Sequence, residues 1–362
     1  MQRFGNLLLN HSNNIEGFKI NEIFPRPLFG KLFSFSKLVK WAAYIDKYLV
    51  FQKRLENVLN QNEHKIGTVH IIDHSNSPYL KTIKKTSSAK CLLTCHDLIA
   101  IRTAMGEFPT APKTSSSGKK LQSWIQNSLS LADFYACDSY HTKSDLNRIV
   151  SSSGSRSKVI HLGTNLNSVN LQNQSEIKSE LLFNPVSTRF ILHVGSAAWY
   201  KNRSGLFQAF QNAKQENQYN DLKLVLVGPP PQEHEINPSL KKWIERNSGD
   251  IYSINHASDK ALSQLYVNAE FLIFPSFIEG FGWPPLEAVS NGCPVITTKT
   301  GAIHDLLGKS AKYVDPSDQE SINHAVIKML EQRNKINEKV SLPCDQQCQE
   351  NYHNLYRKLL KI

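Results

Sequence analysis

Two glutamates eight positions apart are the side chains best placed to do chemistry. Glu279 and Glu287 flank a glycine-rich turn in the run EFLIFPSFIEGFGWPPLEAVSNGCPVITT, in which a buried strand is expected to end just before Glu279. Pro284 or Pro285 can open a helix after the turn, because proline costs no hydrogen bond at a first helical position. Amides at a helix start favour phosphate, and glycine lets the backbone come close to a ligand. The run therefore predicts a loop that binds a diphosphate.

The two carboxylates are expected to face different parts of one ligand. Glu287 is predicted in the first turn of the helix, where it could accept two hydrogen bonds from the vicinal hydroxyls of a ribose. Glu279, across the loop, would face the other end of the ligand. The alternative interpretation of Glu287 is that it only complements the helix dipole.

Several other catalytic motifs are missing from the sequence. It contains no His-Glu-x-x-His, and Gly308–Ser310 is not a phosphate-binding loop because Ile303 stands where that loop needs glycine. Pro285 stands where a dinucleotide fingerprint would have its third glycine. The run Cys95–Asp97 could suggest a cysteine–histidine dyad, but neighbouring residues at a strand end point in different directions. A Cys/His nucleophile is therefore not expected.

Short apolar runs supply the strands that would position these residues. From Val69 onward, β-branched runs alternate with amphipathic stretches, which is typical of βαβ units and parallel sheets. The runs are VHIID, CLLTCHD, FYACDS and KVIHLG, then RFILHVGS, LKLVLVG, DIYSIN, EFLIFPS and PVITT. The predicted fold class is α/β, with two Rossmann-like, doubly wound parallel-sheet domains.

The polar stretch around residues 165–188, rich in Asn, Gln and Ser, separates the two sets of strands. We therefore expect an N-terminal domain over residues 1–168 and a C-terminal domain over 186–340. A last helix is expected within 341–362, where apolar residues recur at helical spacing, and it would pack back on the N-terminal domain.

The positive charge lies in the first half of the chain. The protein has a net charge of +11, and residues 1–170 hold 22 of its 42 Lys and Arg but only 11 of its 31 Asp and Glu, leaving 20 of each sign in the remainder. An excess of this kind indicates an anionic partner, such as a membrane surface, a phosphorylated acceptor or nucleic acid.

Residues 24–55 suit the interface of an anionic bilayer, because basic and aromatic side chains alternate there. The segment contains seven Lys or Arg and the aromatic residues Phe24, Phe29, Phe33, Phe35, Trp41, Tyr44, Tyr48 and Phe51. The alternative is that these aromatics pack into the domain core while the charges form a solvated face.

No apolar run approaches the roughly 18 residues of a membrane-spanning helix, and the N-terminus lacks a signal-peptide pattern. A cytoplasmic protein, peripheral on the inner face of the cytoplasmic membrane, is expected. The six cysteines have no metal-ligand spacing, so we expect reduced thiols and no bound metal.

Together these motifs resemble the retaining family 4 of GT-B glycosyltransferases. The resemblance rests first on the E-x7-E pair in EGFGWPPLEA and the following GCPVI. It extends over most of the chain through LLTCHDLIAI, CDSYHTKSDL, VIHLGTN and SDKALSQLYVNAEFLIFPS, which occur in the family's order. The absence of Asp-x-Asp agrees, because that motif marks the metal-dependent GT-A type.

The resemblance implies roles for the residues that match the family's motifs. Glu287 would bind the ribose of the donor, and Glu279 the sugar hydroxyls near the reacting carbon. Lys201, in HVGSAAWYKNRSGL, would lie on the diphosphate, in keeping with the need of a charged leaving group for a fixed cation. His96 would line the cleft from the opposite domain. Further donor contacts are expected from Gly280, Phe281, Gly282, Gly195, Ser196, Arg203 and Ala257, and acceptor-side contacts from Asp97 and His74.

The chain also departs from the family's pattern. Ser196 and Tyr200 stand where the family often has an arginine, for which Arg203 could compensate, and Asp305 replaces a glutamate. The segment MQRFGNLLL is expected to be a helix, so the family's first strand and glycine-rich turn are expected to be missing.

The resemblance implies a metal-independent retaining glycosyltransferase that needs no cofactor besides its nucleotide diphosphate sugar. The acceptor would be a glycan or a lipid-linked molecule in envelope or exopolysaccharide synthesis, and nucleic acid is not expected as a partner. The alternatives are an epimerase or hydrolase of sugar nucleotides with the same fold, or a non-catalytic sugar-nucleotide-binding protein.

Overall fold

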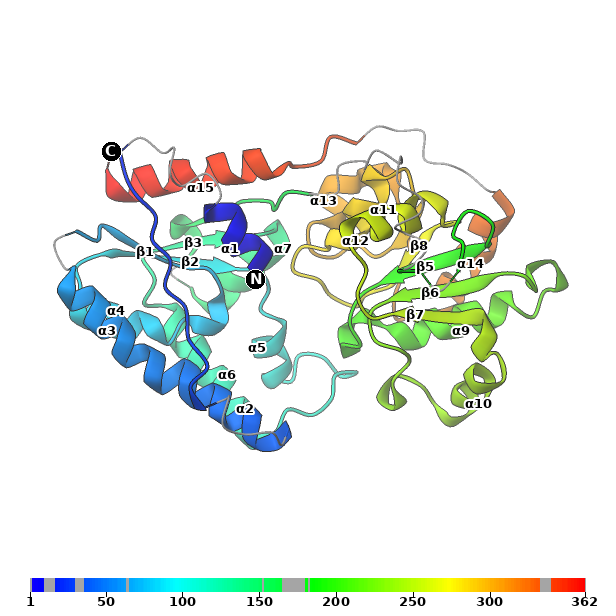
Figure 1. Ribbon diagram of the computed structural model, residues 1–362, viewed down its shortest axis with the longest axis horizontal. Helices are drawn as coiled ribbons and strands as arrows, with labels where there is room; N and C mark the ends of the chain where they lie inside the picture. Colours follow the sequence, from blue (N-terminus) through cyan, green and yellow to red (C-terminus); the bar gives the residue numbers. More distant parts are fainter. Residues whose placement is uncertain are drawn as a thin grey trace. The chain divides into compact units, whose positions relative to one another are not determined.

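The computed structural model describes residues 2–9, 17–29, 36–62, 65–151, 153–164, 180–181, 183–332 and 340–361. They form two compact α/β units, coloured along the chain in Figure 1. Unit 1 comprises Met1–Phe108, Lys113–His161 and Asp345–Ile362, and unit 2 comprises Pro109–Pro112 and Leu162–Cys344. The chain passes into unit 2 at Leu162, before the predicted boundary at 168, and most of the predicted linker lies outside the described residues.

Unit 1 is built on a four-stranded parallel sheet in the order β1-β2-β3-β4. Its strands are β1 (Thr68–Ile71), β2 (Lys90–Cys95), β3 (Phe134–Cys137) and β4 (Ser157–Val159). Five consecutive residues of β2 are buried, which is why the strand appears in the sequence as an unbroken apolar run. Its helices are α1 (Gln2–Leu9), α2 (Ser36–Ile45), α3 (Phe51–Gln61), α4 (Tyr79–Thr86), α5 (Ile99–Ala104), α6 (Ser116–Leu129), α7 (Tyr140–Ile149) and α15 (Asp345–Leu360).

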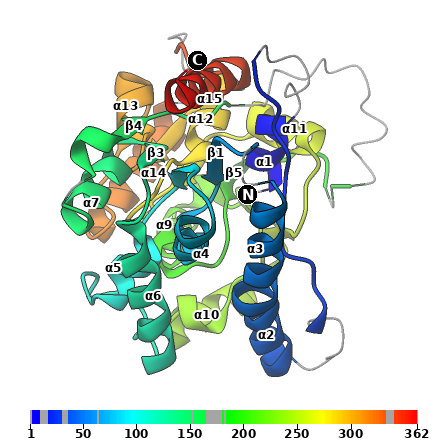
Figure 2. The ribbon, with the colours of Figure 1, turned by 90° about the vertical axis from the view of Figure 1, so that its left-hand side faces the viewer.

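Helices α2 and α3 are joined by one π-helical turn, η3 (Asp46–Val50), and are visible in Figure 2 as a long blue column. Helix α3 buries Phe51, Leu55 and Leu59, which share one face at helical spacing. Tyr48 is buried as well, so at least part of the aromatic set of residues 24–55 belongs to the core. Phe33 and Phe35, and the side chain of Trp41, lie outside the described part of the chain.

The first and last helices of the chain pack together in unit 1. The Gln349 side chain of α15 donates to the Leu7 carbonyl of α1, the N-terminal segment that is helical as predicted. Two tyrosines of α15 reach a strand histidine: His70 Nδ1 lies 2.7 Å from Tyr356 Oη, and Thr94 Oγ1, itself 2.7 Å from His70 Nε2, lies 3.1 Å from Tyr352 Oη. Helix α15 thus closes part of the core of unit 1.

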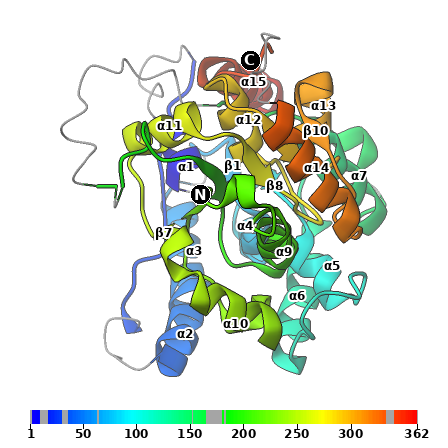
Figure 3. The same cartoon turned by 90° about the vertical axis from the view of Figure 1, so that its right-hand side faces the viewer.

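Unit 2 contains a six-stranded parallel sheet in the order β10-β9-β8-β5-β6-β7. The strands are β5 (Phe190–Val194), β6 (Lys223–Val227), β7 (Ile251–Ile254), β8 (Leu272–Phe274), β9 (Val295–Thr297) and β10 (Lys312–Tyr313). The helices are α9 (Arg203–Ala213), α10 (Pro238–Arg246), α11 (Asp259–Asn268), α12 (Trp283–Ser290), α13 (Ile303–Leu307) and α14 (Gln319–Gln332), with α9 and α14 side by side (Figure 3). The nine predicted runs form β1 to β9, which confirms the fold class; β10 was missed.

The strand order of unit 2 reverses beside β5. The chain first builds outward through β6 and β7, then crosses back to place β8 on the other side of β5. At such a switch point the loops that follow the two central strands diverge, and ligands of doubly wound sheets bind there. The fold therefore points to the loops after β5 and β8.

Candidate functional site

The strands of unit 1 end in polar side chains. Because all four strands are parallel, their carboxyl ends lie at one edge of the sheet. The residues that follow the strands there are Asp73 and His74, His96 and Asp97, Asp138, and His161. Among them are all three residues predicted for this half of the protein: His96, Asp97 and His74.

His96 is held at both of its ring nitrogens. Nδ1 lies 2.5 Å from Asp138 Oδ2, and Nε2 lies 2.8 Å from the Ile72 carbonyl oxygen. Burial alone would lower the pKa of His96, but the Asp138 carboxylate and the Ile72 carbonyl outweigh it and raise the pKa to about 9. A carbonyl only accepts, so Nε2 must carry a proton. His96 is therefore a fixed donor rather than a free base.

His74 and Asp97 are held more loosely. His74 is buried, with Nδ1 3.6 Å from Asp73 Oδ1, and burial lowers the pKa of His74 although Asp97 and Asp73 oppose the shift. One carboxylate oxygen of Asp97 accepts from the Ile99 amide at 3.0 Å, at the start of α5.

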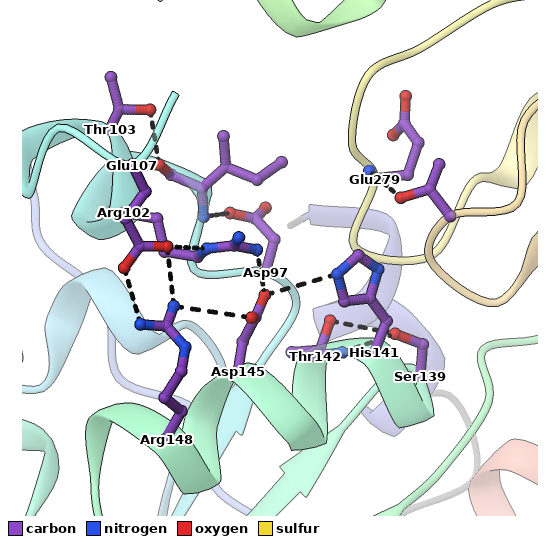
Figure 4. A network of polar contacts seen from close by, with 12 residues as sticks. Asp97, Arg102, Thr103, Glu107, Ser139, His141, Thr142, Asp145, Arg148 and Glu279 are labelled. Atoms are coloured by element: carbon purple, nitrogen blue, oxygen red, sulfur yellow. Dashed lines mark hydrogen bonds and ion pairs between the residues drawn. The ribbon is translucent and has the colours of Figure 1, made fainter. Parts of the chain in front are cut away.

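A network of ion pairs continues along this edge (Figure 4). Arg102 Nε donates to Glu107 at 2.7 Å and Arg102 Nη1 to Asp145 at 2.6 Å, while Arg148 forms two 2.8 Å bonds to Glu107. The network joins α5 to α7 and holds the backbone that follows Asp97 in place.

The loops after β5 and β8 in unit 2 meet in an ion pair. Lys201 Nζ lies 2.8 Å from Glu279 Oε1, and their side chains are only 12% and 8% exposed. A second bond joins the same loops, since the Phe277 amide donates to the Tyr200 carbonyl at 2.8 Å. Two residues predicted from separate motifs, 78 positions apart, thus come together at the switch point of the sheet.

The Lys201 loop depends on two unusual backbone positions. Asn202 adopts a left-handed conformation, φ +49°, while its side chain caps α9 by accepting from the Gly205 amide at 3.2 Å. Gly195, directly after β5, lies against Gly228, where a Cβ would lie 2.1 Å from the Gly195 carbonyl oxygen. Only glycine fits at position 228, and Ser196 is left exposed beyond it.

The Glu279 loop is held by the loop after β9. The Glu279 amide donates to Thr300 Oγ1 at 3.0 Å, and the Ala302 amide donates to the Phe281 carbonyl at 3.0 Å. Gly282, with φ +92°, precedes α12, and a Cβ there would lie 2.5 Å from Ile303 Cγ1. The predicted run of Gly280, Phe281 and Gly282 therefore has a backbone held from both sides.

Glu287 lies in α12 and is buried, with Oε2 accepting from Tyr266 Oη at 3.2 Å. The helix begins at Trp283, so Glu287 occupies its second turn, and the prediction of the first turn was wrong. The reason is that the helix begins before the two prolines, with Trp283 as its first residue. Helix-dipole complementarity therefore accounts poorly for Glu287, because that effect falls off within the first turn.

Comparison with known proteins identifies the family of this region. Residues 174–341 match the model of the family described as glycosyl transferases group 1. This part of the chain is a glycosyl transferases group 1 domain. The Lys201–Glu279 pair and Glu287 all belong to this group 1 domain.

Curated relatives align with a limited part of the chain. This chain is 31% identical over 144 residues to O-antigen chain mannosyltransferase B of Escherichia coli. The alignment covers 39% of this chain and 37% of that protein. The chain is 40% identical over 79 residues to O-antigen chain mannosyltransferase RfbU of Salmonella typhimurium, 22% of each. The capsular polysaccharide biosynthesis glycosyltransferase CapM of Staphylococcus aureus is 31% identical over 140 residues, 38% of this chain and 36% of that protein. The matches thus span well under half the length of these relatives.

Solved structures show the fold over both units. A sucrose-phosphate synthase from Thermosynechococcus elongatus superposes with a TM-score of 0.64 at 17% identity, covering 86% of this chain and 79% of that one. An Escherichia coli trehalose-6-phosphate structure bound with UDP-2-fluoro glucose gives a TM-score of 0.59 at 12% identity, covering 98% and 85%. The protein has the GT-B fold, as predicted.

Two predicted residues of the group 1 domain have other contacts here. The Arg203 guanidinium is buried, with Nε 3.2 Å from Glu235 Oε1, and burial lowers the pKa of Arg203 although Glu235 opposes it. Its role at a phosphate stays a prediction. Ala257 precedes Ser258, the N-cap of α11, whose hydroxyl donates to Glu180 at 2.7 Å.

Sequence reasoning missed several residues that hold the predicted ones in place. Asp138, Thr300 and Tyr266 contact His96, Glu279 and Glu287 across 42, 21 and 21 positions. Asp138 carried a signal, since it directly follows a predicted strand; the other two carried none. Among the described residues, no three His, Cys, Asp or Glu side chains gather closely enough to hold a metal ion.

Proposed function

We propose that the protein transfers a sugar from a nucleotide diphosphate sugar to a glycan or lipid-linked acceptor, with retention of configuration and without a metal ion. The observation that carries the proposal is the Lys201–Glu279 pair at the switch point of a group 1 domain. The relatives named for O-antigen and capsular polysaccharide synthesis favour a role in envelope polysaccharide assembly at the cytoplasmic face of the membrane.

Lys201 is the fixed cation in this mechanism. A nucleotide diphosphate leaving group gains negative charge as the glycosidic bond breaks, and a preorganised ammonium group stabilises that charge. Lys201 Nζ is held by Glu279 at 2.8 Å, with the Phe274 ring 4.6 Å away, so its side chain is already ordered. When the donor binds, its diphosphate would pair with Lys201 in place of Glu279. The Glu279 carboxylate would then accept hydrogen bonds from the sugar hydroxyls.

Glu287 is proposed to hold the ribose of the donor. Its carboxylate accepts from Tyr266 Oη at 3.2 Å, which fixes its orientation, and a carboxylate can accept more than one hydrogen bond on each oxygen. The amides of Gly280, Phe281 and Gly282 are proposed as further donors to the sugar or the diphosphate.

His96, Asp97 and His74 are proposed as acceptor-side residues. Because Nε2 bonds to the Ile72 carbonyl and Nδ1 to Asp138, His96 would line the acceptor site with a charged ring and would not act as a base that removes a proton. One carboxylate oxygen of Asp97 accepts from the Ile99 amide, and the other would accept hydrogen bonds from acceptor hydroxyls.

The test compares Glu287→Gln and Lys201→Met with the wild type in calorimetric titrations with nucleoside diphosphates. Each variant is expected to bind at least tenfold more weakly, because a charge-assisted hydrogen bond contributes about 1.5–3 kcal/mol. Glu245→Gln, an exposed change on α10, is the matched control and should bind as the wild type does. Equal affinity for all four proteins would remove Glu287 and Lys201 from the site.

Transfer is then assayed with a panel of nucleotide sugars, with and without membrane extract and EDTA. Nucleotide release should require the extract and should survive EDTA. Release without any acceptor would instead indicate a hydrolase, and binding without release under any condition a non-catalytic protein. Loss of activity in EDTA that Mg²⁺ or Mn²⁺ restores would contradict a metal-independent mechanism.

A further inference from the structure

Large exposed hydrophobic side chains gather on one part of unit 1. Of the eleven exposed in the described chain, five lie within residues 24–49. They are Phe24 (53% exposed), Leu28 (56%), Phe29 (42%), Ile45 (41%) and Leu49 (67%), and we call them the strap surface. Single exposed apolar residues are common, but a cluster of this kind marks an interaction site.

The strap surface combines two segments that hydrogen bonds hold together: residues 17–29 and the helical segment from α2 to α3. The extended residues 17–29 run beside α2 and α3, as the dark-blue trace in Figure 2 shows. The buried Asp46 carboxylate accepts from the amides of Leu28 and Phe29, each at 3.0 Å. Arg54 Nη1 donates to the Phe24 carbonyl at 3.2 Å, which holds the other end of the apolar stretch. The backbone that carries the exposed side chains of Phe24, Leu28 and Phe29 is therefore held in place by hydrogen bonds.

The helical part of the surface follows from the helix period. Ile45, Leu49 and Lys53 are spaced by four, so they lie on one face, while Tyr48, Phe51 and Leu55 point into the core. Asp46, which accepts from the amides of Leu28 and Phe29, adjoins Ile45 in the chain. These two bonds thus hold the backbone of Leu28 and Phe29 against Asp46, the residue that follows Ile45.

Two basic side chains border the apolar ones. Arg26 lies between Phe24 and Leu28 in the sequence, and the Lys53 side chain is 76% exposed. Lys53 Nζ lies 3.8 Å from Glu56 Oε2, a surface pair too weak to keep Lys53 from a lipid phosphate. The Asp46 carboxylate is not part of the exposed surface, because it is buried and bonded to two amides. Exposed apolar groups within a basic rim match an anionic bilayer, in which acyl chains lie beneath negative headgroups.

We propose that the strap surface docks the protein onto an anionic lipid bilayer. Phe24, Leu28, Phe29, Ile45 and Leu49 enter the headgroup region, while Arg26 and Lys53 contact the lipid phosphates. No helix of the described chain is long and apolar enough to cross a bilayer. The inference deepens the proposed function, since it supplies the surface at which a lipid-linked acceptor would be met.

The test is co-sedimentation of the full chain with vesicles of phosphatidylcholine alone or mixed with phosphatidylglycerol. The wild type is expected to bind the mixed vesicles at low salt and to keep a salt-resistant fraction, because inserted apolar groups are not screened. The triple variant Leu28→Ser, Phe29→Ser, Leu49→Ser should lose at least tenfold in vesicle affinity. Lys53→Glu should lose about fivefold or more at low salt, since a basic residue near an anionic surface contributes about 1 kcal/mol.

The controls carry changes of the same kind on unit 2. Val186→Ser with Val267→Ser alters residues of similar exposure, 67% and 46%, and Lys242→Glu alters an exposed lysine; all should bind vesicles as the wild type does. Circular dichroism and nucleoside diphosphate affinity, measured without lipid, show whether each variant is folded and keep donor binding separate from docking. Equal vesicle binding by the triple variant and the unit 2 variants, or no binding of the wild type to anionic vesicles, overturns the proposal.

Discussion

At the scale of residues, three histidines have pKa values shifted in opposite directions. Burial lowers the pKa of His70 and of His193 to about 3, whereas Asp138 overcomes burial and raises the pKa of His96 to about 9. Since the unfolded value is about 6.5, His96 adds up to about 3 kcal/mol of stability below that pH, which is lost as pH rises through 9. NMR titration of labelled histidines should show His96 titrating near pH 9, with His70 and His193 neutral down to about pH 5.

The variant Asp138→Asn separates the two causes of the His96 shift. Without the carboxylate, burial acts alone and the pKa of His96 should fall below its ordinary value. Urea unfolding of unit 1 between pH 6.5 and 9.5 should then lose most of its pH dependence. A wild-type His96 that titrates near 6.5 would show that the Asp138 contact is weaker than its 2.5 Å distance indicates.

At the scale of elements, the turn into α12 depends on close packing as well as on backbone conformation. Gly282 and Gly292 both have positive φ, +92° and +74°, but only at Gly282 would a Cβ meet a neighbour, 2.5 Å from Ile303 Cγ1. Gly292→Ala should cost about 1 kcal/mol through backbone strain alone. Gly282→Ala should lower the free energy of unfolding by about 1–3 kcal/mol more than Gly292→Ala does, because its Cβ overpacks against Ile303. It should also weaken nucleotide binding. Urea unfolding and calorimetry measure both effects, and equal losses in the two variants would show that Ile303 yields freely.

At the scale of the whole molecule, the chain completes unit 1 only after it has built unit 2. Helix α15 buries Cys348, Tyr352, Leu355 and Tyr356 in unit 1, and each such side chain contributes about 1.5–3 kcal/mol. Ending the chain at Cys344 should therefore destabilise unit 1 by about 5 kcal/mol or more while unit 2 keeps its fold. Limited proteolysis should cut residues 65–161 at least tenfold faster in the shortened protein. Equal acceleration within residues 190–332 would instead show that the two units unfold together.

Nine of the ten strands found among the described residues, and the loop between Glu279 and Glu287, were predicted from the amino-acid sequence. Short parallel strands are buried on both faces, so they appear as apolar runs, whereas the two residues of β10 are too few to form one. Gly280 and the two prolines act through their own backbones, so their effect could be predicted locally. The close approach of Ile303 to Gly282 and the helical turn that holds Glu287 could not, because they depend on the packing of α13 and on where α12 starts. Three contacts could be found only in the folded protein: Lys201 with Glu279, His96 with Asp138, and Asp46 with the Leu28 amide. These contacts span 18 to 78 positions, and the order of strands in a sheet or the packing of a segment on a helix decides which distant residues meet.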